Sequence, residues 1–302
     1  MADPAHNEIP RVIDYEGSDY QTSFWDQGGR AYEDQTEAIA LRRLLPSGGS
    51  LMLEIGAGAG RNTPRYQGYQ RVVVMDYSVT QLQQAQKRLG RSSRYIYVAA
   101  DVYRLPFVSG LFDGVTMIRV LHHIEDVPRA LAVIRDAVQT GGIFILEYAN
   151  KRNLKAILRF WLGRQKWNPF TREQVEFVEL NFNFHPKTVR EDLKRASFKL
   201  ERQLTLSHFR VGLLKRVVPT KILVWLDALF QLTGGLWQYS PSVFTRSQAV
   251  GDPVGVEAGA FFRCPHCGDR LEEKPGQDFL DSSCGKRWAV QDGIYNFKEP
   301  VN

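Results

Sequence analysis

Leu51-Met-Leu-Glu-Ile-Gly-Ala-Gly-Ala-Gly-Arg61 is the stretch around which the chain is organised. The apolar run up to Ile55 predicts a short buried strand, because its apolar residues follow one another instead of alternating with polar ones. Gly56, Gly58 and Gly60 then predict a tight turn where the backbone passes close to a ligand, since a Cβ there would block the approach. We therefore expect a nucleotide-type crevice at the carboxyl end of a first parallel strand.

The spacing of the glycines argues against a dinucleotide. That fingerprint needs G-x-G-x-x-G, but the third glycine is replaced by Arg61 when counting starts at Gly56, and by Thr63 when it starts at Gly58. Glu54 precedes the turn, and a carboxylate there repels a pyrophosphate but suits a cationic ligand. A plain strand-to-helix turn is the alternative. The pattern E-x-G-x-G-x-G resembles the first motif of class I S-adenosylmethionine-dependent methyltransferases, which implies that the methionine end of the cofactor is held by Glu54, Gly56, Ala57, Gly58 and Gly60.

Length and composition set the outer limits. The 302 residues, 43% of them hydrophobic, allow one large domain and a small one. The net charge of +6 favours acidic partners without choosing among nucleic acid, an anionic membrane surface and an acidic small molecule. Residues 1–10 lack the apolar core of a signal peptide, and no run of ~20 apolar residues predicts a membrane span. Three clustered cysteines fit a metal site in a reducing, cytoplasmic location.

Strand-like and helix-like segments alternate after the glycine turn. Four more strands are predicted, at 71–75, 95–100, 112–118 and 143–147. Helices are predicted at 30–45, 78–89 and 126–138, with a chain break at Gly141-Gly142 before the fifth strand. This alternation indicates βαβ units and a parallel sheet.

Two further acids follow strands. Asp76 lies 22 residues after Glu54, where a carboxylate can take both ribose hydroxyls of an adenosine; a helix N-cap is the alternative. The methyltransferase resemblance extends the cofactor site to Tyr77, to Arg119 and to an adenine-binding pair, Asp101 and Val102.

The pattern F-D-x-V…L-H-H-I-x-D at 112–126 resembles quinone-type C-methyltransferases and their small-molecule relatives. The resemblance covers residues 30–150. It places His122 and His123 where a substrate would rest, so either could be a general base, or one could cap a helix while the other packs beneath the cofactor. Tyr32 lies in the helix that the resemblance places over the cofactor, and it is a further candidate catalytic residue. The alternative is that it is an ordinary surface residue.

The next hundred residues are predicted to form the acceptor side. Residues 151–172 hold seven basic residues and no acidic one, interleaved with aromatics, and predict a basic amphipathic helix. It could cover an anionic substrate, lie on an acidic membrane, follow an RNA backbone or be a solvated cap. A helix at 186–196, a strand at 198–207, an apolar helical insertion at 211–232 interrupted by Pro219, and a last strand at 239–247 follow. The pocket is expected to be apolar with a basic rim.

The C-terminal tail contains Cys264-Pro-His-Cys267 and, 16 residues on, Cys284. Two C-x-x-C knuckles would predict a tetrahedral zinc ribbon, but Asp281 stands where the missing cysteine should be. Two possibilities stay open. The module could bind zinc through Cys264, Cys267, Cys284 and Asp281, with His266 as an alternative ligand, or it could be a metal-free remnant of a zinc ribbon. The tail resembles the zinc-ribbon partner subunit that supports several RNA and protein methyltransferases.

Together these features predict an α/β, Rossmann-like, seven-stranded methyltransferase domain over 1–250, with helical insertions at about 148–236, and a zinc-ribbon-like module over 251–302. The expected reaction moves a methyl group from S-adenosylmethionine to a hydrophobic or anionic small molecule. An RNA or protein acceptor, a nicotinamide oxidoreductase and a non-catalytic binding protein are the alternatives.

Overall fold

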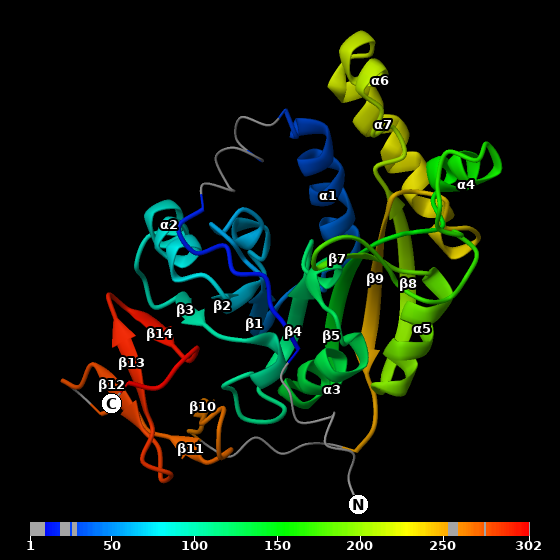
Figure 1. Cartoon of the computed structure of the whole chain (residues 1–302). Helices are drawn as coiled ribbons and strands as arrows, with labels where there is room; N and C mark the ends of the chain where they lie inside the picture. Colours follow the sequence, from blue (N-terminus) through cyan, green and yellow to red (C-terminus); the bar gives the residue numbers. More distant parts are fainter. Residues whose placement is uncertain (1–9, 19–24, 26–28, 253–258, 275, 302) are drawn as a thin grey trace, which may run out of the picture.

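A central parallel sheet organises the chain (Figure 1). The computed structural model describes residues 10–18, 25, 29–252, 259–274 and 276–301. Seven strands form the order β3-β2-β1-β4-β5-β9-β8, in which β9 alone is antiparallel to its neighbours. Their bounds are β1 Gly49–Ile55, β2 Tyr69–Asp76, β3 Tyr95–Ala99, β4 Phe112–Met117, β5 Val138–Ala149, β8 Phe198–Leu206 and β9 Ser242–Ala249. The predicted α/β, Rossmann-like fold is therefore confirmed, and its last strand, β9, runs opposite to the others.

The strand ends meet where the site is expected. Ile55 of β1 is in register with Met75 of β2 and Met117 of β4, so the carboxyl ends of three neighbouring strands coincide. These strands read as continuous apolar runs because both faces of the sheet are covered.

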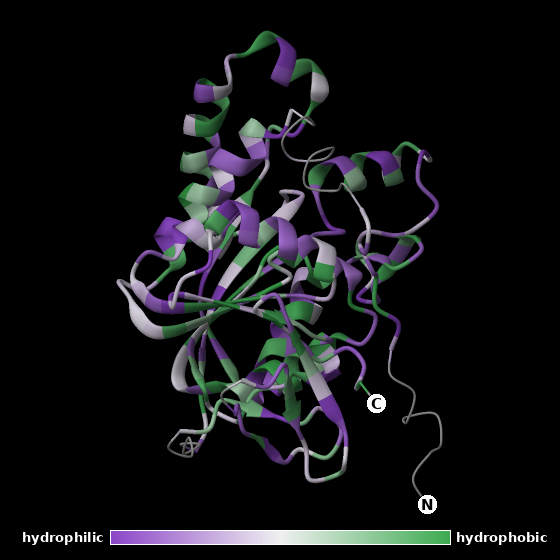
Figure 2. Cartoon of the chain, turned by 90° about the vertical axis from the view of Figure 1, so that its left-hand side faces the viewer, coloured by the Kyte–Doolittle hydropathy of each residue, from purple (hydrophilic) through white to green (hydrophobic). Residues whose placement is uncertain are grey.

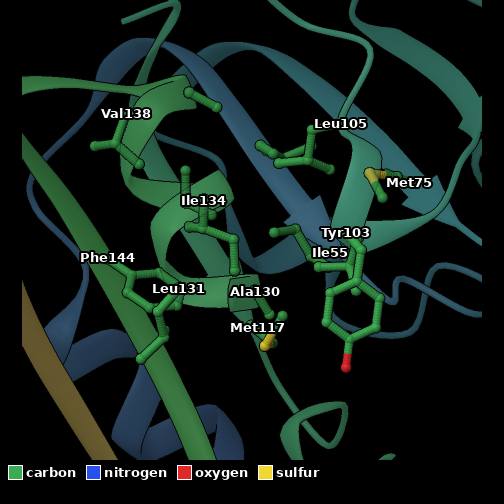
Figure 3. Packing of buried hydrophobic residues seen from close by; sticks show 14 of the residues in the cluster. Ile55, Met75, Tyr103, Leu105, Met117, Ala130, Leu131, Ile134, Val138 and Phe144 are labelled. Carbon is green, nitrogen blue, oxygen red and sulfur yellow. The ribbon is translucent and has the colours of Figure 1, made fainter. Parts of the chain in front are cut away.

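Seven α-helices pack around this sheet: α1 Ala31–Leu44, α2 Val79–Leu89, α3 Val127–Ala137, α4 Leu154–Trp161, α5 Pro186–Arg195, α6 Gly212–Val217 and α7 Thr220–Phe230, counting the described residues. Ser78 caps α2 by accepting from the Gln81 amide, and Asp126 caps α3 by accepting from the Arg129 amide. Figure 3 shows Ala130, Leu131 and Ile134 of α3 packed on the sheet, each fully buried. Burial of a Leu or Ile side chain contributes about 1.5–3 kcal/mol.

Three segments differ from the sequence prediction. Gly141 and Gly142 do not break the chain: β5 runs through them, and they accommodate a bulge in its pairing with β4, where a Cβ on Gly142 would lie 2.8 Å from Val138 Cγ1. The basic helix ends at Trp161 instead of continuing to residue 172. A short hairpin, β6 Val175–Val178 and β7 Asn181–Asn183, was not predicted. Pro219 divides the insertion into α6 and α7.

The C-terminal tail extends the main sheet. Its strands are β10 Phe262–Arg263, β11 Arg270–Leu271, β12 Phe279–Asp281, β13 Arg287–Gln291 and β14 Ile294–Asn296. β14 lies parallel to β3, and β13 and β12 follow outward, giving one ten-stranded sheet. Phe262, Trp288 and Phe297 belong to the same buried cluster as β1 and β4, so the tail shares the core of the larger domain. None of the helices in the described part of the chain combines the length and apolar character that a membrane span requires.

Candidate cofactor and acceptor site

The glycine turn forms the floor of the site. Gly56 and Gly58 have φ of +68° and +53°, which a residue with a Cβ rarely adopts. A Cβ on Gly56 would lie 2.0 Å from Val120 Cγ2. The Ala57 amide donates to the Met75 carbonyl at 2.9 Å, and the Gly58 amide donates to Asp76 Oδ2 at 2.8 Å. The turn is thus fixed against the end of β2.

A cavity of about 120 Å³ opens above this turn. It brings together six of the residues predicted to bind the cofactor: Gly56, Gly58, Asp76, Tyr77, Val102 and Arg119. Most ligand pockets measure roughly 300–1,000 Å³. This one is small because Val12, Ile13 and Tyr15, from the described segment 10–18, form one of its walls. Glu16 fixes that segment by accepting from the Val79 and Thr80 amides at the start of α2.

Asp76 lines the cavity with its carboxylate already oriented. Oδ2 accepts from the Gly58 amide and Oδ1 from the Ser78 amide at 2.9 Å. Burial raises the pKa of Asp76, against the lowering effect of these backbone hydrogen bonds. Each carboxylate oxygen has two acceptor sites, so the pair can still receive two hydroxyl groups.

Gln81 is a residue that the sequence analysis did not identify. Its Nε2 donates to the Ser18 carbonyl at 3.2 Å, which directs Oε1 toward the glycine turn. Oε1 is buried and has no hydrogen-bond partner among the described residues. A buried amide oxygen without a donor is costly, so this atom is suited to accept from a bound ligand.

A second hollow of about 60 Å³ lies across the turn and shares Gly56, Gly58, Gln81 and Arg119 with the first. Trp25 and Arg61 form its far side, with the Arg61 guanidinium 3.5 Å from the centroid of the indole ring. Beneath them lies Glu37 of α1, which accepts from Arg61 at 2.7 Å and from Arg119 Nε at 2.6 Å. Burial alone would raise the pKa of Glu37, but the two guanidinium groups outweigh it and hold that pKa below its usual range.

Arg119 is held in a strained conformation between the two hollows. Its φ is +58°, which costs roughly 1–3 kcal/mol in a residue with a side chain. Its amide donates to Glu147 Oε2 at 2.9 Å, and Ser242 Oγ donates to the other oxygen of Glu147 at 2.6 Å. Glu147 and Glu37 therefore fix Arg119 from both sides.

Glu54 and Gly60 are not brought into either hollow. Glu54 accepts from Thr63 Oγ1 at 2.5 Å and from Tyr66 Oη at 3.2 Å on the other side of β1, because successive side chains of a strand point to opposite faces. Burial raises the pKa of Glu54 to about 7. Gly60 lies against α2, where a Cβ would be 2.8 Å from Leu89 Cδ1.

Asp101 also does not line either hollow, although its neighbours Ala100 and Val102 do. Its Oδ1 accepts from the Tyr103 amide at 2.9 Å and caps the 3₁₀ turn Val102–Arg104. Arg104 lies 3.6 Å from the other oxygen. One of the three predicted carboxylates, Asp76, therefore faces the shared cleft.

The two histidines have different surroundings. His123 lines the cavity, and its Nδ1 lies 3.0 Å from the Leu180 carbonyl, which can only accept, so Nδ1 carries the proton. Its Nε2 then accepts from Tyr15 Oη at 3.1 Å, so both ring nitrogens are occupied. The His122 ring packs against that of His123, with the centroids 3.9 Å apart and the planes inclined by 47°. Burial, with the nearby His123, Arg119 and Arg210, lowers the pKa of His122 well below its usual value.

Tyr32 does not reach either hollow. It is buried between α1 and α7, where its hydroxyl donates to Asp227 Oδ2 at 2.6 Å and accepts from the Phe209 amide at 3.0 Å. Tyr32 therefore joins α1 to the insertion through both hydrogen bonds of its hydroxyl.

Three cysteines converge in the tail. The Sγ atoms of Cys264, Cys267 and Cys284 all lie within 4.8 Å of one another, with Cys264 and Cys284 at 3.9 Å. Sulfur ligands about 2.3 Å from a tetrahedral zinc are roughly 3.8 Å apart, so this spacing fits the ion. Asp281 does not join the cluster, because its carboxylate lies 3.2 Å from Arg287 and 3.9 Å from Lys274. Ser282 takes the predicted place of Asp281, with Oγ 3.2 Å from the sulfurs of Cys267 and Cys284.

Residues 53–146 match the family model described as a methyltransferase domain, and they contain the end of β1, the whole of β2, β3 and β4, and most of β5 of the central sheet. Among characterised proteins, the demethylmenaquinone methyltransferase of Thermobifida fusca is 34% identical over 101 residues, which cover 32% of this chain and 43% of that protein. The malonyl-[acyl-carrier protein] O-methyltransferase of Legionella pneumophila is 25% identical over 183 residues, which cover 58% of this chain and 60% of that protein. The chain thus spans about half the length of these relatives.

Solved structures support the same fold. A complex between the Haloferax volcanii Trm112 methyltransferase activator and a putative methyltransferase gives a TM-score of 0.54 at 15% identity, covering 80% of this chain and all of the matched one. An S-adenosylmethionine-dependent methyltransferase from Mesorhizobium loti gives 0.53 at 19% identity, covering 72% of this chain and all of the other. At these identities the likeness establishes the fold alone.

Proposed function

We propose that the protein transfers a methyl group from S-adenosylmethionine to a hydrophobic or anionic small molecule. The observation that carries the donor assignment is the buried, unpartnered Gln81 Oε1 beside the glycine turn, together with Asp76 in the same cavity. Asp76 would receive the ribose hydroxyls, and Gln81 Oε1 would accept from the ammonium group. Arg61 and Arg119 supply the positive charge that the methionine carboxylate needs.

The apolar part of the same cavity suits the adenine. Ile55, Met75 and Val102 line it, and a purine ring gains most from such a surface. An adenosyl group would displace part of the segment 10–18, which now forms a wall of the cavity. Catalysis then depends chiefly on placing the acceptor in line with the sulfonium methyl, because that leaving group is intrinsically reactive.

Of the two histidines, His122 is the candidate base for an acceptor that must lose a proton. Both nitrogens of His123 are occupied by Leu180 and Tyr15. His122 lies directly behind His123, outside the lining of both hollows, and its lowered pKa leaves its imidazole neutral at pH 7, so it would act on an acceptor that reaches past His123. Tyr32 is not proposed as a catalytic group, because its hydroxyl is occupied by Asp227.

Calorimetry with S-adenosylmethionine tests the donor site. Asp76→Ala and Gln81→Met should each weaken binding by about tenfold or more, since each removes a hydrogen bond worth roughly 1.5–3 kcal/mol when the ligand is charged. Glu54→Gln is the matched control: Glu54 lies outside both hollows, so affinity should stay within about threefold. Equal losses in all three variants would contradict the proposed arrangement. Formation of S-adenosylhomocysteine with a panel of lipophilic quinols and carboxylic acids would then identify the acceptor class.

The tail is proposed to bind zinc through Cys264, Cys267 and Cys284, with Ser282 or water as the fourth ligand. The spacing of the three sulfurs supports this, and the Ser282 hydrogen bond lowers the pKa of Cys267 to about 7, which favours the thiolate. One zinc per chain by elemental analysis, lost in Cys284→Ala and kept in Asp281→Asn, is the expected result. If Asp281→Asn instead loses the zinc, Asp281 is a ligand and the proposed set of ligands is wrong.

A further inference from the structure

Helix α4 exposes a row of apolar side chains to solvent. Leu154, Leu158, Trp161 and Leu162 are 57%, 47%, 69% and 66% exposed, and their spacing places them on one face. Ala156 and Ile157 are the buried residues of the same helix. The helix is thus apolar on the face that points away from the protein.

Helix α7 repeats this arrangement. It packs on α1 through Leu223, Val224 and Asp227, which are buried. Ile222, Trp225 and Leu229, at i, i+3 and i+7, lie on the opposite face and are 49%, 62% and 50% exposed. In Figure 2 the helix pair at the top of the molecule, α6 and α7, carries green apolar residues along its exposed length.

The two helices lie beyond the same end of the sheet and are linked through residues 232–239. Leu232, Leu236 and Trp237, all exposed, continue the chain from α7 toward Tyr239. The Leu154 amide at the start of α4 donates to the Tyr239 carbonyl at 2.8 Å, and Figure 1 shows α4 and α7 beyond the same end of the sheet. We refer to the exposed apolar residues of α4, α7 and 232–237 as the docking face.

Basic side chains border the docking face. Lys155, Arg159, Arg164 and Lys166 are exposed on and after α4, and Arg216 and Lys221 are exposed near the start of α7. None of these six forms a salt bridge with a described residue. Residues 151–172 contain no acid, and the acid of α7, Asp227, is buried.

We propose that the docking face binds the surface of an anionic phospholipid bilayer, with the leucines and tryptophans at the acyl-chain boundary and the six cations among the headgroups. Trp and Leu on one side of a helix and Lys and Arg beside them are the features of interfacial helices. A symmetric dimer through this face would bring the two sets of cations together, which is unfavourable. A protein groove that binds RNA combines basic residues with exposed aromatic rings on which bases stack, whereas most exposed apolar residues of the docking face are aliphatic.

Co-sedimentation of the full chain with vesicles tests this inference without relying on methyl transfer. The protein should pellet with phosphatidylglycerol–phosphatidylcholine vesicles. Its partition constant should be at least about tenfold lower with pure phosphatidylcholine vesicles, because each basic residue near an anionic surface raises the partition constant severalfold. Lys155→Glu/Arg159→Glu and Trp161→Ser/Trp225→Ser should each lower the partition constant by about tenfold or more. All four positions are exposed, so thermal melting should match the unmodified protein.

Lys87→Glu/Lys199→Glu is the matched control. It changes the net charge by the same amount at two exposed positions, on α2 and at the start of β8, and should leave vesicle binding unchanged. Failure to pellet with anionic vesicles at low salt would overturn the proposal. So would binding that the tryptophan variants leave intact, or a dimer in light scattering that those variants abolish while vesicle binding is absent.

Discussion

Replacing Gly56 by alanine should damage the site far more than the same change at Gly58, although both glycines have positive φ. At Gly56 the new Cβ would lie 2.0 Å from Val120 Cγ2, and 3.3 Å from Val120 Cβ. At Gly58 its closest neighbour would be Gln81 Oε1, at an ordinary contact distance of 3.7 Å. The pair therefore separates a steric clash from backbone conformation.

The magnitudes follow from these distances. An alanine in the left-handed region costs roughly 1–2 kcal/mol, and this is the whole expected effect at Gly58. Gly56→Ala adds an overpacking cost of about 1–3 kcal/mol, because Val120 lies against the turn and must move. We expect a loss of about 2–5 kcal/mol in the free energy of unfolding for Gly56→Ala.

Urea unfolding of Gly56→Ala, Gly58→Ala and Gly56→Ala/Val120→Ala measures the difference. Val120→Ala removes the clashing methyl group, so the double variant should regain part of the steric cost relative to Gly56→Ala. Equal stability of the two single variants, or no recovery in the double variant, would refute the steric reasoning.

Three further predictions concern buried polar groups. Burial raises the pKa of Glu54 to about 7, so between about pH 4.5 and 7 the folded state keeps a proton that the unfolded state has released, and the free energy of unfolding falls over that range. The stability advantage of Glu54→Gln should therefore grow by about 2.5 kcal/mol between pH 5 and pH 8 in urea unfolding. Glu37→Gln should cost about 3 kcal/mol at pH 7, because two buried guanidinium groups lose their carboxylate; this cost should shrink as the pH falls through the lowered pKa of Glu37. Tyr15→Phe should cost about 1 kcal/mol and shift the His123 imidazole resonances in NMR, because it removes the donor to Nε2. A flat difference with pH for Glu54→Gln or Glu37→Gln, or unchanged His123 resonances, would contradict the corresponding prediction.

The sequence predicted the sheet well because its signals are local. A continuous apolar run such as Val72 to Met75 favours a strand buried on both faces, and the acid or glycine after it locates its carboxyl end. The glycine pair at 141–142 misled the prediction, because the same residue type ends a strand in one context and accommodates a bulge in another. The pairing of β14 with β3 joins residues almost 200 positions apart, which no local pattern reports.

The glycine turn of the candidate site could be predicted from the sequence, but several side chains that surround the turn could not. Gly56, Gly58 and Asp76 line one cavity, and the sequence could indicate this because turn conformation and strand ends are visible in it. Glu54 was predicted to hold the methionine end of the cofactor, and it lies outside both hollows: it comes one residue before Ile55, which lines the cavity, and alternation along the strand turns it away. Gln81, Glu37 and Trp25 come from other elements, so only the folded chain brings them to the turn.

The position of the tail suggests how it acts on the larger domain. β3 would otherwise be the edge strand of the sheet, with unpaired backbone groups along its length. β14 pairs with Tyr97, Val98 and Ala99, and the Phe297 amide donates to the Ala99 carbonyl at 2.7 Å. The next residues, Ala100 and Val102, form a wall of the cavity above the glycine turn. The tail therefore supports the strand that carries this wall, and loss of its cysteine cluster would be felt in the cavity through β3, without any contact between the cysteines and the ligand.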